Sequence, residues 1–252
     1  MPQTMQQPVV DRRAFPQRLR ALSLPRTVRA KRLSDFVLFE DLDPEALRDL
    51  EAATALRVAE KGSFLFLPGD ASSTVYFVVS GRVKISRLSE EGKEFILNLV
   101  DPDQFFGESG VLDDGQRETM AQALAKSILL AVPAARLRQF VARNPTVLMR
   151  LAQCLGSRQR RLEKRLVDLM HKNVLRRLSG LLIQLSHSYG VRDARGTLLQ
   201  IRLSQSTLGN LLGVSRESVN QAVSDLRRRG IIEVSDRRVR IHNLDALMTA
   251  AV

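Results

Sequence analysis

Four polar residues near the carboxyl end of the chain carry donors and acceptors that match the edges of nucleobases. They are Arg216, Glu217, Asn220 and Gln221. In the major groove of DNA, arginine pairs with guanine, glutamate accepts from cytosine, and asparagine or glutamine pairs with adenine. Residues spaced three and four apart share one face of a helix, so a helix here would present these side chains together. The segment therefore predicts an element that reads DNA bases.

The surrounding sequence predicts how this helix is held. Two helical patterns lie within residues 203–226, separated by a turn at Gly213. Ser204 and Ser215 are suited to cap the two helices, and Gly230 is suited to end the second one. This order is typical of a helix-turn-helix. Its buried side is expected to consist of Leu208, Leu212, Val214, Val219, Val223 and Leu226.

Two alternating segments follow the second helix. Ile231–Ser235 and Arg238–His242 predict two strands joined at Asp236 and Arg237, which together form a hairpin wing. Cationic side chains on a wing contact phosphate, and they position a protein without carrying sequence information. The expected contacts to the DNA backbone are the hydroxyls at the helix starts and the wing arginines, namely Ser204, Ser215, Ser218, Arg237, Arg238 and Arg240.

The charge of the chain also favours a polyanionic partner. Lys and Arg number 39 against 27 Asp and Glu, which gives a net charge of +12. The surplus is uneven, because residues 1–34 and 172–252 each carry a net +7 and residues 35–171 a net −2. Nucleic acid is the favoured partner, and an anionic membrane surface comes second. Residues 1–34 are expected to form a mobile basic arm that either is simply solvated or adds non-specific attraction to phosphate.

Several functional classes are disfavoured by what the sequence lacks. Cys154 is the single cysteine, so no intramolecular disulfide and no cysteine-ligated zinc or iron–sulfur site can form, and a reducing compartment is favoured. The three histidines are scattered without a legible nucleophile–base pair, so neither an enzyme nor a metal site is expected. No apolar run reaches the roughly 20 residues that cross a bilayer, and no secretory signal is present. We therefore expect a soluble, cytoplasmic protein.

The middle of the chain has the pattern of an antiparallel β domain. Short apolar runs alternate with turns that contain glycine, which takes positive φ freely. Residues 35–144 are expected to fold, after a short helix that starts at Pro44, into a jelly-roll-like β-roll. The expected strands are Ser63–Leu67, Thr74–Val79, Arg82–Ser86, Phe95–Leu99 and Ile128–Val132.

Residues 145–171 have a helical apolar period. Their leucine stripe is longer than one globular helix needs, so it predicts a partner. Its first half can pack on the chain's own β domain, and its second half favours a paired helix across a two-fold axis. A basic cluster over Arg158–Arg165 interrupts the stripe, and such a run is usually a solvated face. The expected dimerisation helix presents Leu148, Leu151, Leu155, Leu162, Leu166 and Leu169.

Taken together, these motifs resemble the cyclic-AMP receptor protein and fumarate–nitrate regulator family of bacterial transcription regulators. The resemblance runs from about Phe36 to His242. It implies an α+β chain with a cyclic-nucleotide-binding-type β-roll, a long dimerisation helix, and a winged helix-turn-helix over residues 172–252 that binds palindromic operators as a homodimer. The motifs are Pro68-Gly69-Asp70, Tyr76–Val83, Phe106-Gly107-Glu108-Ser109-Gly110, Arg143-Asn144-Pro145 with Leu148-Met149-Arg150-Leu151, and Gly213–Val219.

The implied ligand site departs from family members that bind cyclic AMP. Those members follow a Gly-Glu motif with an Arg-Ser or Arg-Thr pair whose arginine holds the cyclic phosphate. Here Glu118 stands in place of that arginine, and Arg117 lies one residue earlier, where an extended segment would direct its side chain the other way. Leu162 and Glu163 stand where such members have hydroxyls that contact the base. The resemblance therefore implies a degenerate pocket of Gly107, Glu108, Arg117, Glu118, Thr119, Leu162 and Glu163.

The sequence leaves open how the β-roll is controlled. It is a vestigial sensor, or it binds another anion such as a cyclic dinucleotide through Arg117 and the cluster from Arg158 to Arg165, or a partner protein occupies it. No cofactor is expected, and cyclic AMP held in the familiar manner is disfavoured. The rival function is a cyclic-nucleotide-responsive regulatory subunit whose terminal module contacts protein rather than DNA.

The resemblance also implies an operator sequence. Arg216 and Glu217 fall where members read the G·C pairs of a TGTGA-like half-site. Gln221 replaces a third base-reading residue that is usually arginine in cyclic-AMP-type members. We expect a palindrome that keeps the inner TGT-type bases and differs where Gln221 reaches. RNA polymerase is a further expected partner, and activation or repression depends on where the operator lies.

Overall fold

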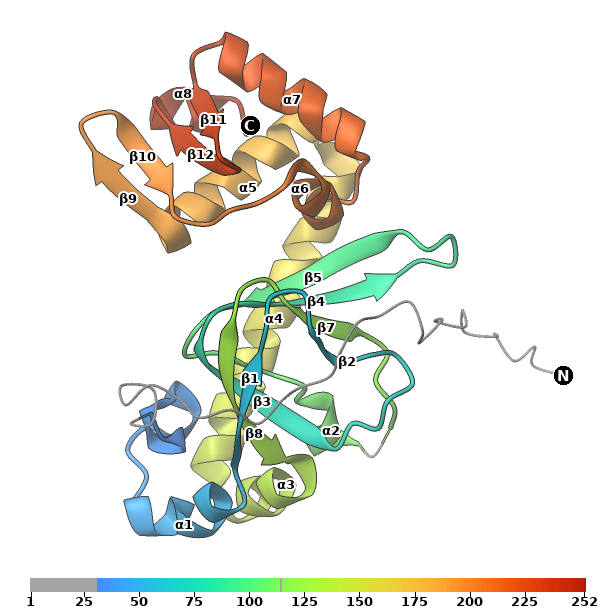
Figure 1. Cartoon of the computed structure of the whole chain (residues 1–252), viewed down its shortest axis with the longest axis vertical. Coiled ribbons are helices and arrows are strands. Elements are labelled where there is room, and N and C mark those ends of the chain that lie inside the picture. Colours follow the sequence, from blue (N-terminus) through green and yellow to red (C-terminus); the bar gives the residue numbers. More distant parts are fainter. Residues whose placement is uncertain (1–30, 114) are drawn as a thin grey trace, which may run out of the picture. The chain divides into compact units, whose positions relative to one another are not determined.

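The computed structural model describes residues 31–113 and 115–252 (Figure 1). The expected basic arm therefore lies outside the described residues as far as residue 30. The chain divides into two compact units, the first ending at Arg158 and the second beginning at Gln159. This boundary falls inside helix α4, which runs from Pro145 to His171 and is the long helix that the apolar period predicts.

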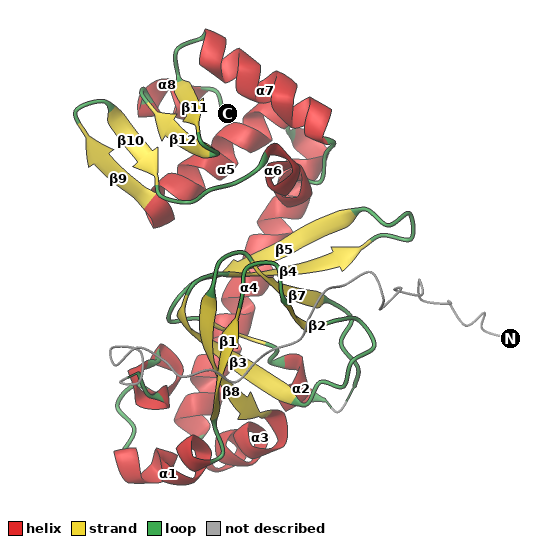
Figure 2. Cartoon of the chain, in the orientation of Figure 1, coloured by secondary structure: helices red, strands yellow, loops and turns green. Residues whose placement is uncertain are grey.

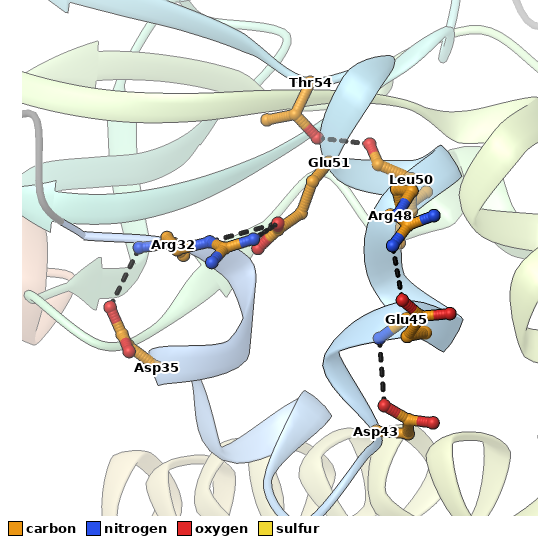
Figure 3. Close-up of polar contacts among 8 residues, drawn as sticks. All are labelled: Arg32, Asp35, Asp43, Glu45, Arg48, Leu50, Glu51 and Thr54. Carbon is orange, nitrogen blue, oxygen red and sulfur yellow. Dashed lines mark hydrogen bonds and ion pairs between the residues drawn. The ribbon is translucent and has the colours of Figure 1, made fainter.

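A short helical segment leads into the first sheet. The amide of Arg32 donates to Asp35 at 2.8 Å, and the Arg32 guanidinium pairs with Glu51 (Figure 3). Asp43 accepts from the amide of Glu45 at 3.0 Å, so it caps the helix that Pro44 begins. The expected helix start at Pro44 is confirmed. The elements of this segment are η3 (Leu33–Asp35), η4 (Val37–Phe39) and α1 (Pro44–Ala52).

Among the described residues of the first unit, the strands form two four-stranded antiparallel sheets. Their orders are β1-β8-β3-β6 and β2-β7-β4-β5, which is the jelly-roll-like arrangement that the sequence predicts. The helices α2 (Ser109–Leu112) and α3 (Ala134–Arg143) lie between β6 and β7 and after β8 in the chain. The strands are β1 (Ala55–Ala59), β2 (Phe64–Phe66), β3 (Thr74–Ser80), β4 (Val83–Leu88), β5 (Glu94–Val100), β6 (Phe105–Phe106), β7 (Met120–Ala123) and β8 (Ser127–Pro133).

The five strands expected from the sequence are confirmed as β2, β3, β4, β5 and β8, whereas β1, β6 and β7 were not predicted. β6 is only two residues long, which gives no alternation to detect. β7 has the sequence Met-Ala-Gln-Ala and lacks the β-branched and aromatic residues that are enriched in strands. These strands form because their neighbours in the sheet pair with them.

Apolar side chains fill two parts of the first unit. One cluster lies among the strands and includes Phe66, Tyr76 and Phe106. The rings of Tyr76 and Phe106 stack with their centroids 5.2 Å apart. The other cluster joins the helices to β3, where Phe77 packs against Phe36 at 5.1 Å between ring centroids. These aromatic rings pack together with the surrounding aliphatic side chains, so the interior of the β-roll is a filled core.

The second unit carries the winged helix-turn-helix (Figure 2). Helices α6 and α7 pack on α5, and the described strands of this unit form one sheet with the order β11-β12-β10-β9. Asp236 and Arg237 both have positive φ, as a two-residue hairpin turn requires, and they join the two wing strands. The wing is confirmed, whereas α5, β9, β10 and α8 were not predicted. The elements are α5 (Val174–Tyr189), β9 (Gly190–Asp193), β10 (Gly196–Leu199), α6 (Gln205–Leu212), α7 (Arg216–Arg228), β11 (Ile232–Ser235), β12 (Arg238–Ile241) and α8 (Leu244–Thr249).

The described residues contain neither a membrane-spanning helix nor a cluster of metal ligands. In residues 31–113 and 115–252, no helix combines the length and the apolar character that a membrane span requires. The same residues hold no group of three or more His, Cys, Asp and Glu side chains placed to bind a metal ion.

Candidate nucleic-acid interface

The turn between α6 and α7 is built by caps and by two glycines. The hydroxyl of Ser204 accepts from the amide of Thr207 at 3.0 Å, and that of Ser215 accepts from Ser218 at 3.2 Å. Gly213 ends α6 in the left-handed conformation with φ of 66°. A Cβ on Gly209 would lie 2.8 Å from a backbone oxygen of the turn, so only glycine fits where the helices cross. The predicted helix-turn-helix is confirmed.

The amino-terminal half of α7 presents the predicted base-reading residues to solvent. Arg216, Glu217, Asn220 and Gln221 are all exposed, whereas the apolar residues of the same helix, from Val219 to Leu226, are buried. Amides in the first turn of a helix have no intrahelical acceptor, so this end also attracts phosphate. The arrangement offers side-chain and backbone donors on one exposed surface, which we call the reading face.

The electrostatics of the reading face keep Glu217 ionised. A hydrogen bond from its own backbone amide lowers the pKa of the Glu217 carboxyl, and the Ser215 hydroxyl and the charge of Arg216 lower it further. A carboxylate accepts hydrogen bonds and donates none, so it suits the amino group of cytosine. At neutral pH the reading face therefore combines a fixed cation with a fixed acceptor.

Gln205 is a residue of this face that the sequence reasoning missed. Its side-chain amide donates to the Oδ1 atom of Asn220 at 3.1 Å, which links the first turn of α6 to the reading face of α7. The signal lay in the motif itself, because the start of the first helix crosses the second helix in a helix-turn-helix. Asn220 is therefore held by a neighbour rather than standing alone.

The serines expected to contact phosphate have partners within the protein. Ser204 lies against Thr207 with 2.9 Å between their hydroxyl oxygens, and Ser215 lies 3.1 Å from Ser218 in the same way. A hydroxyl that accepts from a backbone amide still has its own proton to donate. Contact of these serines with the DNA backbone stays a prediction.

The wing arginines differ from one another. Arg237 is exposed at the turn, and Arg238 is half-buried with a buried Nε that has no hydrogen-bond partner among the described residues. The prediction that Arg240 meets phosphate is wrong, because Arg240 is 8% exposed and its Nη1 donates to both carboxylate oxygens of Asp193, at 2.6 and 2.7 Å. In the sheet β10 lies between β12 and β9, so the Arg240 side chain pairs with Asp193 across the intervening strand.

We expect Arg240→Ala to lower stability and Arg237→Ala to weaken the electrostatic part of DNA binding. Loss of Arg240 leaves the Asp193 carboxylate with the amide of Arg195 but without its ion-pair partner, so the melting temperature should fall while the salt dependence of DNA binding stays the same. Loss of Arg237 should leave the melting temperature unchanged and lower the slope of log affinity against log salt by about one per protomer.

The hydrogen bond from Arg240 lowers the pKa of Asp193, so the pair stabilises the unit above about pH 4, and this stabilisation is lost as the pH falls through that lowered pKa. Thermal melts of the wild type and of Arg240→Ala at pH 7 and pH 3 check this, because the difference in melting temperature between them should be smaller at pH 3.

In the β-roll, Arg117 is buried rather than available to solvent. It is 4% exposed, and its guanidinium donates to the carbonyls of Gly107, at 2.9 Å, and Thr74, and to the hydroxyl of Ser109 at 3.2 Å. It also lies over the ring of Phe66, with 4.3 Å from Cζ to the centroid. Burial lowers the pKa of Arg117, and nearby acidic groups oppose that shift. Arg117 thus holds together the turn that the family resemblance assigns to ligand binding.

Removing Arg117 should therefore destabilise the β-roll. Arg117→Met removes this donor from the carbonyls of Thr74 and Gly107, of which Gly107 still accepts from the amide of Gly110 at 3.4 Å. Each carbonyl left unsatisfied costs about 1–3 kcal/mol. Arg87→Met is the matched control, because Arg87 is exposed and pairs with exposed Glu118 at 3.3 Å, a contact worth about 0–1 kcal/mol. Urea unfolding of both variants compares them, and equal midpoints would contradict the structural role of Arg117.

Glu108 is held by the long helix. The Arg158 guanidinium pairs with the Glu108 carboxylate, donates to the carbonyl of Phe105, and lies 4.8 Å from the Phe105 ring centroid. Both side chains are about four-fifths buried, with 20% exposed. The position of Arg158 in the charged run predicts a solvated face. The structure instead places its guanidinium in contacts within the first unit.

Comparison with known proteins identifies the two modules. The cyclic nucleotide-binding domain family matches residues 56–144, and the Crp-like helix-turn-helix domain family matches residues 176–250. The cyclic AMP receptor protein of Thermus thermophilus is 30% identical over 204 residues, which cover 81% of this chain and 91% of that protein. The chain belongs to the cyclic-AMP receptor protein and fumarate–nitrate regulator family. It is a DNA-binding transcription regulator.

Other members of this family show the same breadth of similarity. The CRP-like cAMP-activated global transcriptional regulator of Mycobacterium tuberculosis is 28% identical over 214 residues, covering 85% of this chain and 96% of that protein. The solved structure of the c-di-GMP responsive global regulator CLP of Xanthomonas campestris matches with a TM-score of 0.71 at 23% identity, over 80% of this chain and all of that one. This structural likeness supports the fold.

The remaining residues of the predicted pocket lie in different surroundings within this chain. Glu118 is exposed beside Arg87, and Thr119 is half-buried just before β7. Leu162 is exposed, and Glu163 accepts from the side chain of Gln159 at 2.9 Å; both lie in the second unit. The proposed pocket is therefore drawn from residues that the structure describes in two separate units.

The stripe of α4 is divided between core and surface. Leu151 is 2% exposed and packs in the core of the first unit, so it is not presented to a partner, whereas Leu155 is half-buried against the same core and its contact with a partner stays a prediction. The reason is that α3 and the β-roll already cover this side of the helix. The other predicted residues of the family's dimerisation helix are exposed: Leu148, Leu162, Leu166 and Leu169.

Proposed function

We propose that this regulator acts as a homodimer on palindromic operators, with the reading face of each protomer in the major groove of one half-site. The exposed Arg216 and Glu217 at the capped start of α7 carry this proposal. The exposed leucines of α4 support the dimer, since an apolar helix face of this length is covered in water by another apolar surface. A two-fold dimer matches an operator whose half-sites are about one helical turn apart.

The operator keeps G·C pairs where Arg216 and Glu217 read, and it differs at the outer position that Gln221 reaches. Bidentate pairing of arginine with guanine and acceptance by glutamate from cytosine favour this assignment. The wing adds phosphate contacts through Arg237 and Arg238. Regulation of transcription then proceeds through the position of the operator relative to RNA polymerase, which we propose as a further partner.

We also propose that cyclic AMP does not control this regulator in the manner familiar from other family members. The guanidinium of Arg117 is already bonded to Gly107, Thr74 and Ser109, and Arg158 is bonded to Glu108. An added phosphate would have to displace these partners. Glu118 stands where a cation would be needed, and Leu162 offers no hydroxyl to a base.

A second candidate is control by a cyclic nucleotide or cyclic dinucleotide. The match of residues 56–144 to the cyclic nucleotide-binding domain favours it, as does the buried Glu108, whose carboxylate could accept from a ribose hydroxyl. In this case a ligand would exchange with the internal partners of Arg117 and Arg158. No catalytic role is proposed for either candidate.

Selection of bound DNA from a random pool, with and without cyclic AMP, cyclic GMP and cyclic di-GMP, tests these proposals together. We expect a palindromic site to be enriched without any nucleotide. Enrichment that requires one of the nucleotides would replace the first candidate by the second. Enrichment of asymmetric, unrelated sites in every arm would refute the homodimeric mode of binding.

A further inference from the structure

Arg165 and Arg177 both bind the carboxyl end of α6, the first helix of the helix-turn-helix. The Nη2 of Arg165 donates to the carbonyl of Leu211 at 2.5 Å, and the Nη1 of Arg177 donates to the carbonyl of Leu212 at 2.9 Å. Arg165 belongs to the end of α4 and Arg177 to α5. We call this pair of contacts the arginine clamp.

The clamp joins groups that need partners. The last carbonyls of a helix have no intrahelical donor, and they carry the negative end of the helix dipole. Burial lowers the pKa of Arg165, and the Nε of Arg177 is buried without a partner among the described residues. Both arginines are thus held in a desolvated place that a lysine or a hydrophobic residue would not fill in the same way.

The clamp lies directly before the reading face in the chain. Leu212 is followed by Gly213 in the left-handed conformation, and the amide of Val214 donates back to Gly209 at 3.0 Å. Ser215 then caps α7, and Arg216 is its first residue. Because this turn has little freedom, a group that fixes Leu211 and Leu212 also fixes the direction in which α7 begins.

One member of the clamp stands on the proposed dimer helix. Arg165 immediately precedes Leu166, which is 61% exposed, and it lies within one turn of the exposed Leu162 and Leu169. These leucines and the clamp all belong to the second unit. The same stretch of α4 therefore carries exposed leucines that suit a partner and an arginine that binds the end of α6.

We infer that Arg165 and Arg177 are positioning residues that set the separation of the two reading faces in the dimer, and hence the operator spacing that this regulator selects. This inference rests on the proposed homodimer. One base pair more or less between half-sites turns one reading face by about a tenth of a turn relative to the other. A rigid clamp resists that rotation, whereas a loosened clamp tolerates it.

The test is binding of the full-length chain to its selected operator, to operators with one base pair added to or removed from the spacer, and to a single half-site. The wild-type protein should bind the altered spacers about tenfold more weakly, similar to the effect of one mismatched base pair. Arg165→Met should reduce this discrimination to about twofold and leave half-site binding unchanged. Arg161→Met is the matched control, because it removes the same charge from an exposed position of the same helix.

The outcomes separate the inference from the proposal beneath it. If Arg165→Met and Arg161→Met discriminate between spacers as the wild type does, the clamp does not set the spacing. If Arg165→Met lowers the melting temperature and also loses half-site binding, the arginine only maintains the fold, and the inference fails as well. If the wild type shows no preference for a palindrome, the homodimer proposal fails instead. Should Arg165→Met not fold, Arg165→Lys and Arg177→Lys carry the same test, because they keep the charge and lose the planar fork.

Discussion

Arg216→Ala should lose specific operator binding by about 1–3 kcal/mol for each half-site, which is the worth of one bidentate contact between arginine and guanine. The side chain is exposed at the first position of α7, so its removal leaves no cavity in the fold. The basic wing still attracts phosphate, so salt-sensitive binding to unrelated DNA should persist. Titration of the selected operator and of a scrambled duplex at physiological salt measures both quantities.

Arg227→Ala is the matched control for this prediction. Arg227 is exposed near the other end of the same helix, so its loss changes the net charge equally without touching the reading face. The ratio of specific to non-specific affinity should fall only for Arg216→Ala. Equal ratios for the two variants would show that Arg216 contributes charge and not base recognition.

The parts of this protein that could be predicted from its sequence are those set by local chemistry. Ser204, Ser215 and Gly213 stop and start helices through bonds within a few residues, so the helix-turn-helix can be read directly. The wing turn depends on two adjacent residues, and α4 repeats one apolar period from Pro145 to His171. Such signals need no knowledge of distant partners.

The fate of each arginine could not be predicted, because it depends on partners far away in the chain. Arg240 pairs with Asp193, and Arg158 pairs with Glu108, across 47 and 50 residues. Arg117 was expected to follow the alternation of a strand. It lies instead in irregular chain before β7, where its guanidinium reaches back to Thr74 and Gly107. Only the packing of the sheets decides these contacts.

This pattern changes what the basic composition means. Arg138 donates to the carbonyls of Gly110 and Val111 at the end of α2, at 2.8 and 3.0 Å, much as the arginine clamp holds the end of α6. Arginine suits this role because its planar fork reaches adjacent carbonyls while staying charged. Part of the positive surplus thus stabilises helix ends inside each unit. Among the described residues of the second unit, the charge available to DNA includes that of the exposed arginines of α7 and of the wing turn.

Leu166→Glu should convert the proposed dimer into a monomer. Leu166 is 61% exposed in the chain, although a leucine on a repeating apolar face is suited to burial. Each leucine buried at a two-fold interface contributes about 1.5–3 kcal/mol, and the substitution removes both copies and places two carboxylates near the axis. The dimer dissociation constant should rise by more than about a hundredfold. Analytical ultracentrifugation over a range of protein concentrations measures this change directly.

Gln153→Glu is the control, because Gln153 is exposed on the opposite side of α4. It is about half a helical revolution away from Leu162, which shares the predicted dimer face with Leu166. It adds the same charge to the helix and should leave the dimer intact. The Leu166→Glu monomer should bind a single half-site as well as the wild type does and lose the gain in affinity that a palindrome confers, because only a dimer engages both half-sites at once. A Leu166→Glu protein that remains dimeric would place the interface elsewhere on the molecule.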